Sequence, residues 1–187
     1  MKNQIMDKFL EGKRCVLRPL AGEDINKRYL KWLNDREVTE YMETGVFPTT
    51  LDELRDFYNR VSTSKTDIMF AVLDKRKNLH IGNIKLGSIN WVHRFADLGI
   101  MIGDKRYWGK GYGPEACRLV LEYAFDRLNL NKVVLGVCST HKNAINVYKK
   151  VGFRIEGRIK RLLNLKRRYV DKLMMGIDQA EFARIIK

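Results

Sequence analysis

The chain has 187 residues and 45% hydrophobic content, enough for one buried core but not for two large ones. No uninterrupted apolar run approaches membrane-spanning length, and the N-terminal segment carries Lys2, Asp7 and Lys8 where a signal peptide would be continuously apolar. We therefore expect a single domain over residues 1–187 that is soluble, cytoplasmic and without a membrane partner.

The charge balance is strongly basic, with 36 Lys and Arg against 22 Asp and Glu and a formal net charge of +14. Such a charge favours anionic partners through long-range steering. Nucleic acid, ribosomes and nucleotide-containing small molecules are all polyanions, so charge alone does not choose between them. The densest basic cluster is either a solvated loop or an anion site, and it comprises Arg158, Lys160, Arg161, Lys166, Arg167 and Arg168.

Three cysteines, Cys15, Cys117 and Cys138, are scattered over two expected strands and one expected helix. Their odd number and their spacing favour reduced, buried thiols over a disulfide framework. No metal site is expected.

The first half of the chain begins with an alternating apolar and polar stretch that predicts a strand at residues 14–20. Helical spacing of apolar residues then predicts helices at about 22–34 and 50–61. Thr50 is a plausible N-cap of the second helix, and Glu53 three residues later completes a capping box. A hairpin and one further strand are expected after it, at 68–73, 81–89 and 98–102.

A glycine-rich segment follows, Arg106-Tyr-Trp-Gly-Lys-Gly-Tyr-Gly-Pro114, between a strand and an amphipathic helix. Gly109, Gly111 and Gly113 permit a tight turn and close approach to an anion, and Pro114 suits the first helical position. Unpaired amides and the positive end of the helix dipole would then favour a pyrophosphate group.

The second half predicts a strand at 131–137 and a helix at 141–151, with Gly152 placed for a left-handed helix cap. Two more strands are expected at 154–161 and 169–177. One face of the helix carries residues at i, i+3, i+4 and i+7, namely Ala144, Val147, Tyr148 and Val151.

Two motifs in this order resemble those of the GNAT N-acetyltransferases. Arg106-x-x-Gly109-x-Gly111 is similar to their acyl-coenzyme-A loop, and Tyr148-x-x-x-Gly152-Phe153 to a second element of that superfamily. The order β-α-α-β-β-β-α-β-α-β-β is also theirs. The resemblance implies an α/β fold with a mixed, mostly antiparallel sheet of about seven strands flanked by helices.

Within that superfamily, three further segments resemble the branch that acetylates the N-termini of ribosomal proteins. They are Leu17 to Leu20, Tyr29 to Asp35 and Asp97 to Gly103, and the finish from Phe153 to Gly157 agrees with them. That branch is similar to the bacterial amino-sugar-nucleotide N-acetyltransferases.

The resemblance implies direct transfer of an acetyl group from acetyl-coenzyme A to a primary amine, with Tyr148 as the acid that protonates the leaving thiolate. A splay between the fourth and fifth strands would hold the pantetheine arm. Many relatives carry Asn where this chain has His141, so either His141 or Asn143 takes that part. The implied cofactor-binding residues are Ile100, Met101, Ile102, Arg106, Gly109, Lys110, Gly111, Tyr112, Gly113, His141 and Asn143.

The acceptor pocket is expected from the first two helices, their connecting loop and the hairpin, although aromatic residues at such spacing are often core. The candidates are Trp32, Tyr41, Phe47, Trp91 and Phe95. The general base is open among Asp97, His93, His80 and Glu40.

We expect the acceptor to be a small molecule such as a nucleotide-linked amino sugar. The alternative within the same chemistry is the α-amine of a ribosomal or other protein. An alternative of another class is a non-catalytic module that binds coenzyme A or RNA. The sequence leaves a homodimer open.

Overall fold

The computed structural model describes residues 8–186. Eight strands form one sheet in the order β1-β2-β3-β4-β5-β6-β8-β7. The strands are β1 (Leu10–Glu11), β2 (Cys15–Pro19), β3 (Ile68–Asp74), β4 (Leu79–Asn90), β5 (Phe95–Ile102), β6 (Lys132–Cys138), β7 (Arg154–Leu165) and β8 (Arg168–Asp178). The α-helices are α1 (Lys27–Leu33), α2 (Leu51–Thr63), α3 (Tyr112–Glu122), α4 (Lys142–Val151) and α5 (Gln179–Ile185).

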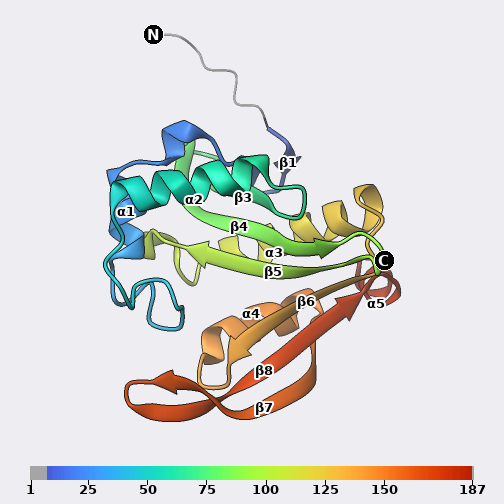
Figure 1. The fold of residues 1–187 in the computed structure, drawn as a ribbon. Coiled ribbons are helices and arrows are strands. Elements are labelled where there is room, and N and C mark those ends of the chain that lie inside the picture. Colours follow the sequence, from blue (N-terminus) through green and yellow to red (C-terminus); the bar gives the residue numbers. More distant parts are fainter. Residues whose placement is uncertain (1–7, 187) are drawn as a thin grey trace.

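Helices cover both faces of the sheet (Figure 1). The larger core packs α3, α4 and α5 against one face, while a smaller core packs α1 and α2 against the other. The expected α/β architecture with a mostly antiparallel sheet is therefore confirmed. One strand more than expected is present, because the two-residue β1 pairs with β2.

Local signals set several element ends where the sequence placed them. Thr50 and Glu53 form the expected capping box at the start of α2. Gly152 ends α4 with a φ of 109°, a left-handed conformation that suits glycine. All three cysteines are free and buried, as expected.

Several elements differ from expectation. Strand β5 begins at Phe95 and β7 ends at Leu165, so both are longer than expected, and three further differences concern helices. Pro114 is the third residue of α3 and not the first, since the helix begins at Tyr112; proline fits there because amides of the first turn have no partner within the helix. The helix expected at 22–34 is a 3₁₀ turn followed by α1, because the side chain of Asn26 accepts hydrogen bonds from the amides of Arg28 and Tyr29. Helix α5 was not expected, although Asp178 and Glu181 form its capping box.

The sheet divides between β5 and β6, the one parallel pair among the described strands. These strands pair only at Phe95 with Lys132, Ala96 with Val133, and Asp97 with Val134. Beyond Asp97, β5 stays paired with β4 and β6 stays paired with β8, so the two halves separate (Figure 1). This opening, here called the β5–β6 split, is the splay that the resemblance implied.

None of the helices in residues 8–186 is long and apolar enough to cross a membrane. The expectation about a signal peptide concerns the N-terminal segment, most of which, residues 1–7, lies outside the described residues.

Candidate active site

The glycine loop, residues 106–113, connects the end of β5 with α3. Gly109 and Gly111 have φ values of 71° and 86°, which side chains with a Cβ rarely adopt. Within the described part of the chain, no group accepts a hydrogen bond from the backbone amides of residues 109–113. These amides and the N-terminus of α3 together fit a pyrophosphate group.

Charged side chains fix the surroundings of the glycine loop. Arg106 donates through Nε and Nη2 to Asp104, at 2.9 and 2.6 Å, and this contact raises the pKa of the guanidinium. The Arg106 side chain remains exposed beside the loop, as does Lys110. Two cations therefore lie where the phosphates of coenzyme A are expected.

A glutamate anchors the first turn of α3 to β2. The Glu115 carboxylate accepts hydrogen bonds from the backbone amides of Arg14 and Cys15, at 2.6 and 3.0 Å. It also pairs with the Arg14 guanidinium at 3.3 Å. Arg14 lies beside the loop, since a Cβ built on Gly111 would be in ordinary van der Waals contact with its Nε, at 3.5 Å.

Ile100, Met101 and Ile102 lie on β5 past the point where the split opens. Their backbone pairs with β4 on one side and has no strand partner among residues 8–186 on the other. Met101 packs into the smaller core, while Ile100 and Ile102 contact the larger one. The free side of this backbone could pair with an extended ligand arm, and that role stays a prediction.

Tyr148 lies on the buried face of α4 and packs edge-on against Phe153, with ring centroids 5.8 Å apart. Burial, with smaller contributions from Cys117 and Asp97, raises the pKa of its hydroxyl. The hydroxyl therefore stays protonated at neutral pH and can act only as a proton donor there. The hydroxyl takes part in none of the side-chain hydrogen bonds found among the described residues, so its proton is not committed to a structural contact.

His141 sits at the N-terminus of α4, where its ring stacks on Tyr41 with centroids 4.0 Å apart and planes 7° apart. Burial lowers the pKa of His141, against an opposing influence of Glu40, so the imidazole is neutral near pH 7. Asn143 is exposed in the first turn of α4. The stack therefore joins Tyr41, which is expected to contact the acceptor, to His141, which is expected to contact the cofactor.

The four candidate bases occupy different environments. Asp97 lies at the point where the split opens, and partial desolvation raises the pKa of its carboxyl against the opposing effect of nearby lysines. His80 is buried and hydrogen-bonds through Nε2 to Asn83 at 3.0 Å. His93 is in the exposed turn before β5, and Glu40 forms an ion pair with Lys166 on the β7–β8 hairpin. Only Asp97 borders the split and also influences Tyr148.

The face of β5 that carries the Asp97 side chain is accessible next to Asp97. Asp97, Gly99 and Met101 alternate along β5 and face the α1–α2 side of the sheet. A Cβ built on Gly99 would meet none of the described atoms within 4 Å beyond its chain neighbours. An acceptor can therefore approach Asp97 from this face.

The expected acceptor aromatics do not gather in one pocket. Trp32 is 6% exposed and packs against His80 and Gly103, because α1 presses its apolar face onto the sheet. Trp91 donates from Nε1 to the carbonyl of Lys65 at 3.0 Å, in the turn before β5. Phe95 begins β5 and is half-buried.

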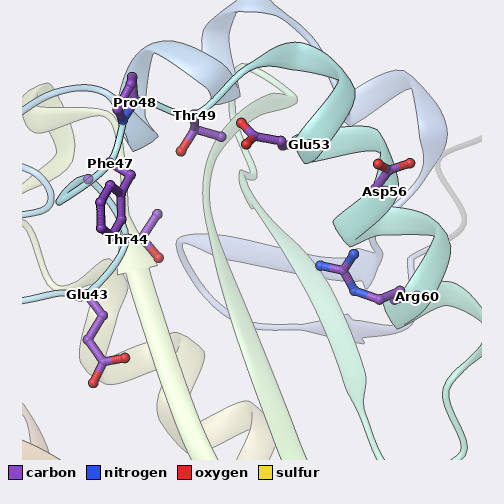
Figure 2. Close-up of a pocket in the computed structure, with 9 residues that line it drawn as sticks. Glu43, Thr44, Phe47, Pro48, Thr49, Glu53, Asp56 and Arg60 are labelled. Carbon is purple, nitrogen blue, oxygen red and sulfur yellow. The ribbon is translucent and has the colours of Figure 1, made fainter.

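Phe47 is 79% exposed and lines a cavity of about 350 Å³ between α2 and the loop before it (Figure 2). Glu53 and Asp56 on α2 and Glu43 on the loop place three carboxylates around this cavity, against the single guanidinium of Arg60. We call it the acidic cavity. Its charge is opposite to that of the chain as a whole.

Sequence reasoning missed Arg14, Asp74 and Glu115, all of which contact the glycine loop or its flanks. Nothing in their local sequence distinguishes them from other charged residues at strand ends or in helices. Within residues 8–186 no group of three or more His, Cys, Asp or Glu side chains could hold a metal ion.

The sequence matches a known protein family and two characterised relatives over most of its length. The family model of the acetyltransferase (GNAT) domain matches residues 14–154. The chain is 32% identical to the spermidine N(1)-acetyltransferase of Vibrio cholerae serotype O1, over 91% of this chain and 96% of that protein. It is 33% identical to the enzyme of the same name from Escherichia coli K12, over 89% and 87%.

A similar fold is found in the crystal structure of the V. cholerae spermidine N-acetyltransferase in complex with CoA and spermine. The TM-score is 0.84 at 29% identity, and the match covers 92% of this chain and 99% of the other.

Proposed function

Since this chain belongs to the acetyltransferase (GNAT) family and is an acetyl-CoA-dependent N-acetyltransferase, we propose that its acceptor is a primary amine of an aliphatic polyamine such as spermidine. The observation that carries this proposal is the identity of 32% to a spermidine acetyltransferase over nearly the full length of both chains. The relatives described above are not named for an amino-sugar nucleotide or a ribosomal protein. The polyamine therefore replaces the nucleotide-linked amino sugar as the acceptor that we favour.

The charges near the split support a cationic acceptor. Asp97 provides a carboxylate at the split. Of the two lysines that influence it, Lys172 on β8 and Lys85 on β4, Lys85 is paired with Asp67 at 3.0 Å. The acidic cavity adds the carboxylates of Glu43 and Asp56 on the α1–α2 side, beside that of Glu53, which also caps α2 (Figure 2). Carboxylates attract ammonium groups, and an extended polyamine has several of them to place.

In the proposed reaction, acetyl-CoA lies along the split with its pyrophosphate on the glycine loop. The ammonium form of the acceptor first loses one proton to solvent, because only the uncharged amine can attack. As the nitrogen attacks, Asp97 accepts a second proton from it, directly or through water, a task that the raised pKa of the carboxyl favours. The amine nitrogen bonds to the thioester carbonyl carbon and forms a tetrahedral intermediate. When the carbon–sulfur bond breaks, Tyr148 donates its proton to the leaving thiolate, so that free CoA and the N-acetyl product result.

A thiol-release assay tests the acceptor. The panel contains spermidine, spermine, an N-terminal peptide and a nucleotide-linked amino sugar, each with acetyl-CoA. We expect kcat/KM for spermidine to exceed that for the peptide and the amino sugar by at least about tenfold, which corresponds to about 1.4 kcal/mol. Equal values, or a preference for the amino sugar, would reject the polyamine proposal.

Asp97→Asn and Asp126→Asn provide a matched pair of variants. Asp126 is exposed in the turn after α3, so the second variant removes the same charge away from the split. Asp97→Asn should lower kcat/KM for spermidine about tenfold or more and abolish the acidic limb of its pH profile. Asp126→Asn should match the parent protein.

A further inference from the structure

A buried carboxylate lies beneath the glycine loop. Asp74 is the last residue of β3 and is 3% exposed. Its Oδ2 accepts a hydrogen bond from the hydroxyl of Tyr107 at 3.2 Å, and its Oδ1 accepts one from the hydroxyl of Tyr112 at 2.9 Å. The two tyrosine rings meet edge to face, 5.1 Å apart and at 85°. One carboxylate thus contacts the residues on both sides of the Gly109 to Gly111 turn.

The two tyrosines are permanent donors in this contact. Burial, followed by the Asp74 hydrogen bond, raises the pKa of Tyr112 to about 12, and burial with the Asp74 charge raises the pKa of Tyr107 as well. Each hydroxyl therefore keeps its proton across the neutral range and can donate it only to Asp74. The geometry of the pair is fixed wherever the enzyme would work.

Asp74 has no cationic partner in the part of the chain that the structure describes. Its remaining polar contact is the backbone amide of Arg76, at 3.3 Å. A buried negative charge beside a phosphate site opposes the binding of an anion. The contribution of this carboxylate to function must therefore lie in the conformation that it imposes on the tyrosines.

Ordering the glycine loop in this conformation costs conformational entropy. Gly109 and Gly111 are in the left-handed region, and glycine loses more conformational freedom on ordering than any other residue. A loop already fixed at both ends binds its ligand without that loss, which is the general advantage of preorganisation.

We propose that Asp74 is a positioning residue for acetyl-CoA, which holds both ends of the glycine loop through Tyr107 and Tyr112 in the conformation that receives the pyrophosphate. This inference rests on the proposed placement of acetyl-CoA at the loop. It does not depend on which amine is the acceptor.

The test compares Tyr107→Phe, Tyr112→Phe and the double variant with the parent protein by calorimetry with CoA. Phenylalanine keeps the rings and removes only the hydroxyls, so the fold, checked by circular dichroism and Tm, should survive. We expect the Kd for CoA to rise about five- to tenfold in each single variant. In the double variant the rise should be less than the product of the two, because both hydroxyls act through one carboxylate.

A kinetic readout separates positioning from a general loss of structure. The KM for acetyl-CoA should rise with the Kd, while kcat at saturating acetyl-CoA should fall less than about threefold. Tyr123→Phe is the matched control, because its hydroxyl takes part in none of the side-chain hydrogen bonds found among the described residues and it lies just beyond α3. It should bind CoA like the parent.

Two results would overturn the proposal: a folded double variant whose Kd for CoA stays within about twofold of the parent, or a fall in kcat with an unchanged Kd. CoA binding is measured without an acceptor, so weakened binding in a protein that does not acetylate spermidine would support the positioning role and reject only the polyamine. Unchanged binding by Gly111→Val would show that the loop is not the site, and would reject the positioning role with it.

Discussion

The two approaches to the β5–β6 split are held in different ways. On the proposed cofactor side, Asp74 ties the glycine loop to β3 and Glu115 ties the start of α3 to β2, while Asp104 holds Arg106 within the loop. All three carboxylates are buried or half-buried. On the acceptor side, the loop between α1 and α2 reaches across to the C-terminal half through the stack of Tyr41 on His141 and the ion pair of Glu40 with Lys166. Phe47 in the same loop projects into solvent.

This contrast bears on how each proposed site achieves specificity. Carboxylates with several hydrogen bonds in a dry environment fix one conformation, whereas a single stack and an exposed ion pair contribute little to rigidity. The rigid side therefore suits one unchanging ligand, the proposed cofactor, and we expect substitutions on the proposed acceptor side to disturb it little.

The largest effect is expected where the two sides meet. Tyr148→Phe keeps the packing of α4 and removes the one proton that the residue can donate. We expect kcat to fall by about a hundredfold to ten-thousandfold, with little change in CoA affinity and a shift of the basic limb of the pH profile. Turnover within about twofold of the parent at every pH would leave Tyr148 with a packing role only.

Gly111→Val alters the proposed cofactor side alone. Valine strains a backbone at a φ of 86° and approaches Arg14, so the Kd for CoA should rise about ten- to hundredfold. Gly113→Ala is the comparison, since a Cβ there meets Val147 at 3.8 Å in ordinary contact and should weaken binding much less. Calorimetry on both folded variants measures the difference, and equal affinities would argue against the loop.

Phe47→Ala alters the acceptor side alone, whereas Tyr41→Ala also removes the ring on which His141 stacks. Each should raise the KM for the acceptor about three- to tenfold, and Phe47→Ala should leave the KM for acetyl-CoA nearly constant. Steady-state kinetics with each substrate varied in turn provides the measurement. If both KM values rise together, the two sides are not independent and the comparison fails.

The smallest effect that we expect is on the pH dependence of thermal stability, through His80 beside the smaller core. Burial lowers the pKa of His80, which faces Asp24, Arg18 and Asn83, so folded protein excludes a proton that unfolded protein accepts. Stability from this residue is complete above the unfolded pKa of 6.5 and is lost as pH falls below it. Thermal unfolding should show a Tm that falls from pH 7 to pH 5, and less steeply in His80→Gln. Parallel curves would assign the loss to other groups.

The sequence predicted the features that lie within one short segment and missed those that depend on contacts between distant segments. The glycine loop and the α4 motif are each contained in a short segment, so spacing alone placed the loop, Tyr148 and Gly152 correctly in the fold. Asp74 acts on Tyr107 and Tyr112 across more than thirty positions, and Glu115 acts on Arg14 across about a hundred. Such contacts exist only once the sheet has formed, so no local sequence pattern predicts them.

Trp32 illustrates the opposite difficulty. Its helical spacing fits both a pocket wall and a core position, and the position of α1 on the sheet decides between them. Only the packed structure shows that a Cβ on Gly103 would overlap the indole ring.

The β5–β6 split also bears on how the protein folds. On one side of it, β3, β4 and β5 pair as antiparallel neighbours in chain order, and on the other β7 and β8 form a hairpin, so most pairing in each half is between strands close in sequence. The halves are joined by three residue pairs of parallel strands, with α3 in the connection between them. Local pairs close quickly and distant parallel pairs slowly. In amide hydrogen exchange, the paired residues of β5 and β6 should therefore be among the last to become protected during folding and the first to open, at the place where we propose that the two substrates meet.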